Sequence, residues 1–165
     1  MDQLTQRGAT RNMVSAAFVL GTTSTYTTTV TTECVIDGVF GTTLAAQTNT
    51  ASPTTDAATG AAFVALTDNK ATVLVWGVTL AGAIALCQGS IEDTEVGVTT
   101  TAGAFLKAPQ WPTLPDDFCP IAYNLVRTAP SASDFTPGTS SWTATGVTCS
   151  TAKNISVLPK RPRIV

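Results

Sequence analysis

The spacing of apolar and polar residues predicts β-strands along most of this chain. In the run 25–36, one face carries Tyr26, Thr28, Val30, Thr32, Cys34 and Ile36, while the other carries Thr25, Thr27, Thr29, Thr31 and Glu33. Side chains alternate between the two faces of a strand, so this run predicts one long strand with one buried face. Asp37-Gly38 follows directly and favours a type I′ turn, because both central residues of that turn need positive φ. A return strand is therefore expected at 39–44.

The most apolar part of the chain, 71–87, predicts a buried hairpin. Strands are expected at 71–78 (ATVLVWGV) and 83–88, with Gly82 in the turn between them. The run approaches the length that spans a membrane. However, Gly77 and Thr79 interrupt it, and its many β-branched residues favour strands. Two antiparallel strands at the centre of the core are therefore predicted, and no membrane partner is expected.

A proline-rich stretch, 108–127 (APQWPTLPDDFCPIAYNLVR), follows this hairpin. Its prolines remove backbone donors and force extended geometry on the residues before them, so no helix runs through it. A strand is expected at 121–126, with Ile121, Tyr123 and Leu125 in the subunit's own core. The apolar side chains that precede this strand are the candidates for a contact with another subunit: Trp111, Leu114 and Phe118.

The remaining segments complete an all-β prediction of eight or nine short strands. They are an exposed loop at 47–60, a short strand or single helical turn at 63–66, and strands at 140–149 and 154–158. The expected fold is a single antiparallel β-sandwich, jelly-roll-like, or a barrel. Residues 1–20 are expected to form an extended N-terminal arm, and residues 21–165 the sandwich body with a basic C-terminal tail.

The chain carries few charges, and they are unevenly placed. Only 12% of its 165 residues are charged, and the net charge of −2 gives no overall field that attracts nucleic acid. Positive charges lie near both ends, at Arg7, Arg11, Lys160, Arg161 and Arg163. Two interpretations fit these residues. They form solvated tails, or they contact an acidic surface on a partner.

The sequence offers little material for catalysis. Histidine is absent, which removes the commonest general base and the commonest zinc ligand. Glu92, Asp93 and Glu95 lack the glycine-containing loop of a calcium site. The adjacent Asp116 and Asp117 point apart on an extended chain, which does not suit a catalytic pair. We therefore expect no enzyme activity, no metal ion and no cofactor.

The cysteines and tryptophans leave alternatives open. The four cysteines are far apart in the sequence and permit two disulfides, yet reduced and buried thiols are expected without a recognisable secretion signal. Trp76 is expected in the core. Trp142 lies among serines and threonines, so it is the tryptophan best placed to stack on a sugar ring. Packing at a strand edge or an interface is the other interpretation of its position.

An ordered set of short motifs between Glu33 and Arg163 resembles virion structural proteins of tailed bacteriophages. The set comprises IDG at 36–38, QG at 88–89, APQWPTLPDD at 108–117, PIAYNLVR at 120–127, DFTPGTSSW at 134–142, TATGV at 143–147 and SVLPKRPR at 156–163. This resemblance implies a capsid decoration (cement) protein or the base of a head fibre, on the exterior of the virion. It implies no catalytic residues.

The resemblance also implies partners. Such proteins are usually homotrimers that bind the major capsid protein after assembly in the host cytoplasm, and a head-fibre protein is a further candidate partner. In the leading interpretation the protein binds the assembled head and stabilises it. The alternative is a head- or tail-fibre module, an adhesin that binds host surface glycans.

Overall fold

The protein folds as an all-β domain, which confirms the fold class expected from the sequence pattern. The computed structural model describes residues 10–163; no helix occurs in that range, and hence none that is long and apolar enough to cross a membrane. The strands are β1 (Arg11–Asn12), β2 (Phe18–Leu20), β3 (Thr25–Thr28), β4 (Cys34–Ile36), β5 (Val39–Phe40), β6 (Gln47–Ala51), β7 (Lys70–Thr79), β8 (Ile84–Gln88), β9 (Glu92–Asp93), β10 (Phe118–Thr128), β11 (Val147–Cys149) and β12 (Lys153–Asn154).

The largest sheet is built on two long antiparallel strands, β7 and β10. Its strand order is β11-β10-β7-β8, with β12 also paired to β10 and β9 to β7. The predicted hairpin of β7 and β8 is confirmed, and Gly82 adopts a φ of 78° in the turn between them. Almost every residue of β7 and β10 is buried, because both faces of this sheet are covered.

Pro120 disturbs the pairing of β10 with β7. The register shifts between Pro120 and Ala122, which is a β-bulge. Proline has no backbone N–H to donate, so within a central strand it is tolerated beside such an irregularity. As a result Ile121 packs on one face of the sheet, while Tyr123 and Leu125 pack on the other. All three are buried as predicted, although simple alternation assigns them to one face.

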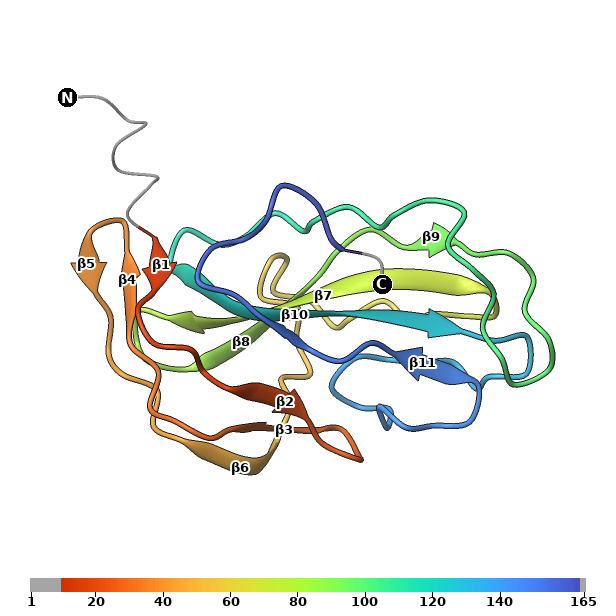
Figure 1. Cartoon of the computed structure of the whole chain (residues 1–165), viewed down its shortest axis with the longest axis horizontal. Helices are drawn as coiled ribbons and strands as arrows, with labels where there is room; N and C mark the ends of the chain where they lie inside the picture. The colour runs from red at the N-terminus through yellow and green to blue at the C-terminus, as the bar shows by residue number, and fades with distance from the viewer. Residues whose placement is uncertain (1–9, 164–165) are drawn as a thin grey trace.

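Two small three-stranded sheets, with the orders β2-β3-β6 and β1-β4-β5, cover one face of the main sheet (Figure 1). Phe18 of β2 and Tyr26 of β3 pack against Trp76 of β7, with ring centroids 4.6 and 5.7 Å from the indole. Cys34 and Ile36 of β4 join the same buried cluster. The arrangement is a β-sandwich whose sheets do not close into a barrel.

Extended segments, and not another sheet, cover the opposite face of the main sheet. Val73, Val75 and Tyr123 line this outer face, and side chains from 105–114 and 155–158 pack against them. In Figure 1 the two segments run along the side of the main sheet away from β2, β3 and β6. The proline-rich stretch therefore rests on the protein's own sheet.

Two strand predictions between residues 25 and 60 are wrong. The run 25–36 is not one strand, because β3 and β4 belong to different small sheets. The segment 47–60 is not entirely loop, because β6 pairs with β3. Asn49 has a φ of 48°, and its N–H donates to the hydroxyl of Thr27, so a bulge accommodates this loop-like sequence in the sheet.

Residues 10–20 belong to the body of the domain, so the expected arm boundary at residue 20 is wrong. β1 pairs with β4 and β2 pairs with β3, and Ala16 and Phe18 are fully buried. The N–H of Phe18 donates to the side-chain oxygen of Asn154 at 2.7 Å, which ties β2 to β12. Residues 1–9 of the expected arm lie outside the described residues.

Strand lengths near the end of the chain are shorter than expected. Within 140–149 only β11 is a strand, and within 154–158 only Asn154, the last residue of β12, is in a strand. The segment 63–66 forms neither a strand nor a helical turn, and Leu66 makes a single bridge with Phe135. These runs carry apolar residues that anchor loops to the core, and composition alone does not separate such loops from strands.

Candidate functional site

Trp111 and Leu114, two of the expected subunit contacts, lie on the outer face and are partly covered by the chain itself. The indole of Trp111 meets the ring of Tyr123 edge-on, with centroids 5.0 Å apart. Its Nε1–H donates to the backbone oxygen of Pro159 at 2.9 Å. Leu114 packs against the same buried cluster. Both side chains keep some exposed surface, so both remain candidates for a contact.

Phe118, the third expected contact, lies inside the domain. Its side chain is 2% exposed and packs against Gly77 of the neighbouring strand β7. A side chain buried in its own subunit has no surface to offer to another. The expectation for Phe118 is therefore wrong, because the strand begins earlier than predicted and takes this ring into the core.

The C-terminal segment 155–163 is fastened to the outer face and is not a loose tail. Besides the bond from Trp111 to Pro159, the backbone N–H of Arg163 donates to the hydroxyl of Tyr123 at 3.3 Å. Pro162 is buried between these two attachments. The segment therefore has a defined position on the body.

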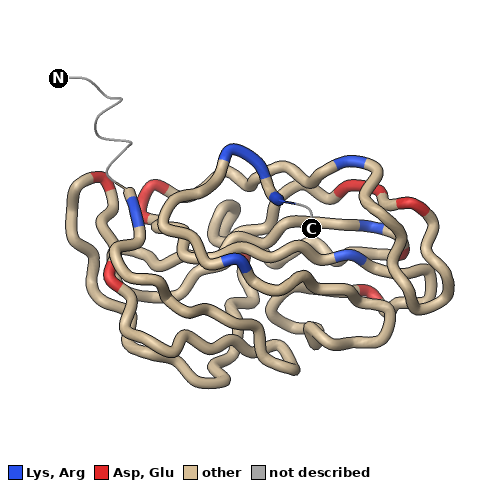
Figure 2. Tube along the Cα trace, viewed as in Figure 1, with Lys and Arg blue, Asp and Glu red and all other residues tan. Residues whose placement is uncertain are grey.

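This fastened segment carries three cations on its exposed side. Lys160, Arg161 and Arg163 are exposed, and none of them has an acidic partner within residues 10–163. Figure 2 shows their positive charges together near the C-terminal end of the chain. A positive charge without a local counter-ion is available to a partner with a negative surface.

Arg11 lies on the strand next to this segment. The N–H of Asn12 donates to the backbone oxygen of Ser156 at 3.0 Å, which joins β1 to the beginning of the C-terminal segment. Arg11 is exposed and has no acidic partner in the described part of the chain. We call Arg11, Lys160, Arg161 and Arg163 the basic strip. Arg7, the remaining basic candidate, lies outside the described residues.

Two lysines outside the basic strip are already paired. Lys107 Nζ lies 3.3 Å from a carboxylate oxygen of Glu92, and Lys70 pairs with Asp93. The pKa of Glu92 is held below its usual range, first by the hydrogen bond that Ser90 donates and then by Lys107. These cations neutralise the acidic loop around β9, so they contribute less to any external field.

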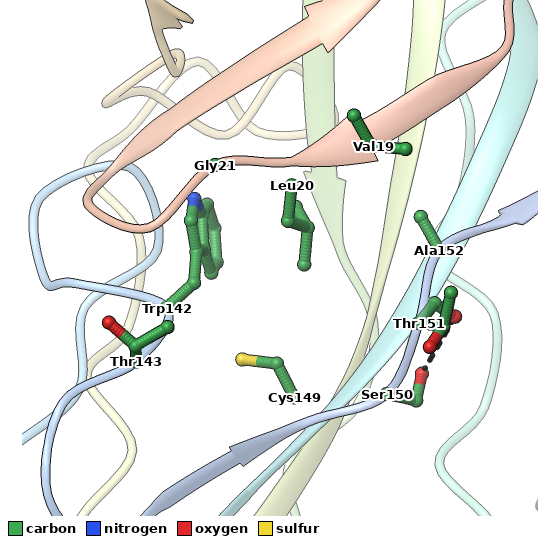
Figure 3. Close-up of a pocket in the computed structure, with 9 residues that line it drawn as sticks. All are labelled: Val19, Leu20, Gly21, Trp142, Thr143, Cys149, Ser150, Thr151 and Ala152. Carbon is green, nitrogen blue, oxygen red and sulfur yellow. Dashed lines mark hydrogen bonds between the residues drawn. The ribbon is translucent and has the colours of Figure 1, made fainter.

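A groove of about 260 Å³ opens between β2 and the residues around β11 (Figure 3). Its lining includes Leu20, Trp142 and Cys149 and the hydroxyl-bearing Thr143, Ser150 and Thr151. Leu20 and the thiol of Cys149 face its interior in Figure 3. Burial raises the pKa of Cys149 to about 12, so its thiol stays protonated near neutral pH. The groove is therefore small, uncharged and mixed in polarity.

Trp142 forms part of this groove but belongs mainly to the core. It is 3% exposed, meets Trp76 edge-on at 5.8 Å, and donates its Nε1–H to the backbone oxygen of Thr25 at 3.0 Å. Little of the indole surface is left for a ligand. Trp142 therefore packs in the core, and not at a strand edge or an interface as the sequence suggested. Stacking of a whole sugar ring on it is not available in this conformation.

Sequence reasoning missed the residues that fasten the C-terminal segment, Tyr123 and Pro159. A partial signal exists, because a half-buried tryptophan such as Trp111 needs an acceptor for its indole N–H. That requirement predicts a carbonyl nearby, but it does not say that the carbonyl comes from a residue 48 positions later. The groove residues Leu20 and Cys149 were missed for the same reason, since two distant segments form it.

Within residues 10–163, no group of three or more cysteine, aspartate or glutamate side chains is placed to hold a metal ion. No protein-family model, no curated protein and no solved structure matches this chain. The basic strip and the groove are candidate binding surfaces of the described residues.

Proposed function

We propose that this protein is a decoration (cement) protein of a tailed-phage capsid, which binds the assembled head through its basic strip. Its partner in that role is the major capsid protein, and its location is the exterior of the virion after assembly in the host cytoplasm. The ordered motifs between Glu33 and Arg163 support this role through their resemblance to virion structural proteins.

The observation that carries the proposal is the fixed position of unpaired cations. Lys160, Arg161 and Arg163 stand on a segment that Trp111 and Tyr123 attach to the body. A charged side chain on a disordered tail loses much conformational freedom when it binds. Cations on a fastened segment lose less, so the basic strip is suited to contact an acidic surface.

The physical effect on the capsid follows from mass action. A protein that binds the assembled shell, and not the free subunits, lowers the free energy of the assembled state. Many weak contacts on a large shell are sufficient for this, because each bound copy adds its own contribution to the stability of the assembled shell. Catalytic groups are not needed, and the proposal assigns none.

A homotrimer is part of the proposal, since the resemblance implies one. Trp111 and Leu114 are the candidate contacts between subunits, because each keeps exposed surface on the outer face. Sedimentation equilibrium at micromolar protein gives the native mass. A monomer under these conditions would remove the trimer from the proposal and leave capsid binding to be tested separately.

The test of the proposal is co-sedimentation with empty capsids assembled from the major capsid protein of the same genome. We expect saturable binding that weakens as salt is raised, because salt screens exposed charges. In the double variant Lys160→Gln, Arg161→Gln the dissociation constant should rise by about tenfold. The double variant Lys70→Gln, Lys107→Gln makes the same change in net charge at already paired lysines, and it should bind nearly as the parent protein does.

Absence of binding by the parent protein would overturn the proposal. If both double variants bind capsids equally weakly, only net charge matters, and the basic strip would no longer be the proposed binding surface. Thermal unfolding of each variant alone must match the parent protein, so that loss of binding is not loss of fold.

A second candidate function is an adhesin that binds host surface glycans. The observation that favours it is the groove, where Thr143, Ser150 and Thr151 offer hydroxyls beside the apolar Leu20. A groove of this size fits one sugar residue at its rim, and not a stacked ring on Trp142. Thr151→Tyr should fill the groove, because residue 151 lines it, and its exposure lets a larger side chain fit without disturbing the core. Loss of binding to host-cell glycans in this variant, with capsid binding unchanged, would favour the adhesin.

A further inference from the structure

The groove shown in Figure 3 lies between the edges of two sheets. β2 is the edge strand of the small sheet β2-β3-β6, and β11 is an edge strand of the main sheet. An edge strand presents backbone N–H and C=O groups that its own sheet leaves unpaired. The direction of these groups on each rim therefore decides what the groove can bind.

On the β2 rim, the backbone of Leu20 points away from its own sheet. The N–H of Gly21 donates to the backbone oxygen of Thr25, so these two residues form a hydrogen-bonded pair of the ladder between β2 and β3. Such pairs alternate along an antiparallel ladder, so Leu20 directs its N–H and C=O away from β3. The backbone of Phe18 points the same way, and the side chain of Asn154 binds it. The Leu20 backbone has no hydrogen-bond partner within residues 10–163.

The opposite rim presents matching backbone groups at Cys149. The N–H of Ser150 donates to the backbone oxygen of Leu125 just beyond the end of β11, so residues 125 and 150 are a hydrogen-bonded pair. By the same alternation, Cys149 directs its own N–H and C=O away from β10. These groups have no partner in the described part of the chain. Leu20 and Cys149 therefore each offer one donor and one acceptor to a strand that lies between them.

The lining of the groove is unfavourable to charge. None of its nine residues is acidic or basic, and the apolar side chains of Leu20 and Trp142 lie beside the hydroxyls of Thr143, Ser150 and Thr151. A charged side chain that entered this space would lose hydration without gaining a counter-ion. An extended backbone presents N–H and C=O groups to both of its sides, as the two rims require. The groove therefore fits a short, uncharged, extended peptide with an apolar side chain.

The first nine residues of the chain contain a stretch with this character. They read MDQLTQRGA, in which QLTQ at 3–6 is uncharged and carries one apolar side chain, Leu4. Nine residues span about 30 Å when they are fully extended. The described chain begins at Thr10, which is hydrogen-bonded to Asp37 in the turn between β4 and β5. This turn lies at the end of the domain that β5 occupies, away from the groove between β2 and β11 (Figure 1).

We propose that residues 3–6 of one copy bind as an added strand in the groove of a second copy. This inference rests on the proposed homotrimer, which brings the second copy within reach. Leu20 and Cys149 pair with successive residues of the added strand, and Leu4 packs beside Trp142. Main-chain hydrogen bonds hold such a strand at a sheet edge. Exchange of a short segment between copies joins subunits at low cost, so the trimer does not need a large apolar interface.

The test places a photo-cross-linking residue, benzoylphenylalanine, at position 4 of the full chain. Copies with natural nitrogen and copies labelled with heavy nitrogen are unfolded together in urea, refolded and irradiated. We expect cross-linked peptides that join position 4 of one isotopic form to residues 19–21 or 149–151 of the other form. Mass spectrometry identifies both peptides and the isotopic form from which each comes.

Two matched pairs of variants test the groove and the added strand separately. Thr151→Tyr fills the groove and should lose the cross-link, whereas Val157→Tyr, at an exposed position outside the groove, should keep it. Leu4→Asp puts a charge into the groove, so the protein concentration at which half of the trimer dissociates should rise about tenfold. Thr5→Asp puts the same charge on the opposite side of the added strand and should have little effect. Circular dichroism of each variant should match that of the parent protein.

Three results would overturn the inference. They are cross-links within one isotopic form only, cross-links to surfaces other than the groove, and an undiminished cross-link in Thr151→Tyr. A monomeric protein would overturn it together with the proposed trimer. Capsid binding is measured apart from these experiments, by co-sedimentation. If the parent protein gives the cross-link but does not bind capsids, the capsid role fails and the exchanged strand stands. If capsids are bound and no cross-link forms, only the exchanged strand fails.

Discussion

The ring of Phe118 on β10 lies directly against the Cα of Gly77 on β7. A Cβ added at residue 77 would overlap three atoms of that ring. Gly77 lies within a regular strand and has no positive φ, so packing and not backbone conformation requires glycine here. The ring takes the space that a side chain on β7 would otherwise fill, and it closes one end of the outer face.

This contact predicts that Gly77→Ala destabilises the protein by about 1–3 kcal/mol, the usual range for overpacking a core. Urea unfolding followed by fluorescence gives the free energy of unfolding. Gly41→Ala is the matched control, because a Cβ there meets no atom closer than 3.5 Å. The double variant Gly77→Ala, Phe118→Leu removes the ring that the added methyl group meets, so it should recover part of the lost free energy of unfolding. An alanine at 77 as stable as glycine would contradict the packing argument.

A buried hydrogen bond predicts a second effect at the centre of the main sheet. Trp76 Nε1–H donates to Asn124 Oδ1 at 2.9 Å, and both residues are fully buried. Asn124→Leu leaves the indole N–H without this acceptor and should lower the free energy of unfolding by about 1–3 kcal/mol. The double variant Trp76→Phe, Asn124→Leu should lose less than the two single variants combined. Simple additivity of the two losses would argue against this bond.

The parts of the fold that sequence predicts are those in which local pattern and burial agree. The strands β7 and β8 were predictable because a continuous apolar run is broken by a glycine turn. Alternation also predicted the buried positions Tyr26, Cys34 and Ile36 correctly, but Val30 on the same expected face is exposed. It predicted a single strand incorrectly, because a side-chain pattern does not say which sheet a strand joins.

The parts that sequence does not predict depend on distant residues. The bulge after Pro120 moves Ile121 to one face and Tyr123 to the other, and alternation has no signal for it. The basic strip was predictable as charge, but its attachment depends on Trp111 finding the backbone of Pro159. Backbone acceptors leave no trace in side-chain identity, so such contacts appear only in three dimensions.

That attachment predicts how the C-terminal segment responds to the loss of one hydrogen bond. Trp111→Phe keeps an aromatic ring beside Tyr123 but removes the N–H that bonds Pro159. The segment should open more often, so limited trypsin digestion after Lys160 should become several-fold faster. Trp142→Phe is the control, because it removes an indole N–H bonded to Thr25 elsewhere in the molecule. Equal cleavage rates in Trp111→Phe and the parent protein would rule out a role for this bond.

Glu92 predicts a dependence of stability on pH. Its pKa in the folded protein is lowered, first by the hydrogen bond from Ser90 and then by Lys107. A lowered folded pKa means that the ionised carboxylate stabilises the fold. This contribution is complete above the unfolded pKa, near 4.3, and is lost as pH falls through the folded pKa. The urea midpoint should therefore decrease below about pH 5 in the parent protein and decrease less in Glu92→Gln.

The cause of the shift can be tested at the carboxylate itself. Ser90→Ala removes the hydroxyl that donates to Glu92 at 2.7 Å and leaves Lys107 in place. A carbon-detected NMR titration should show the pKa of Glu92 moving upward, toward its ordinary value. Lys107→Gln should move it in the same direction, because the hydrogen bond and the positive charge of Lys107 both lower this pKa. If Lys107→Gln moves the pKa more than Ser90→Ala does, the ion pair and not the hydroxyl sets the acidity of this loop.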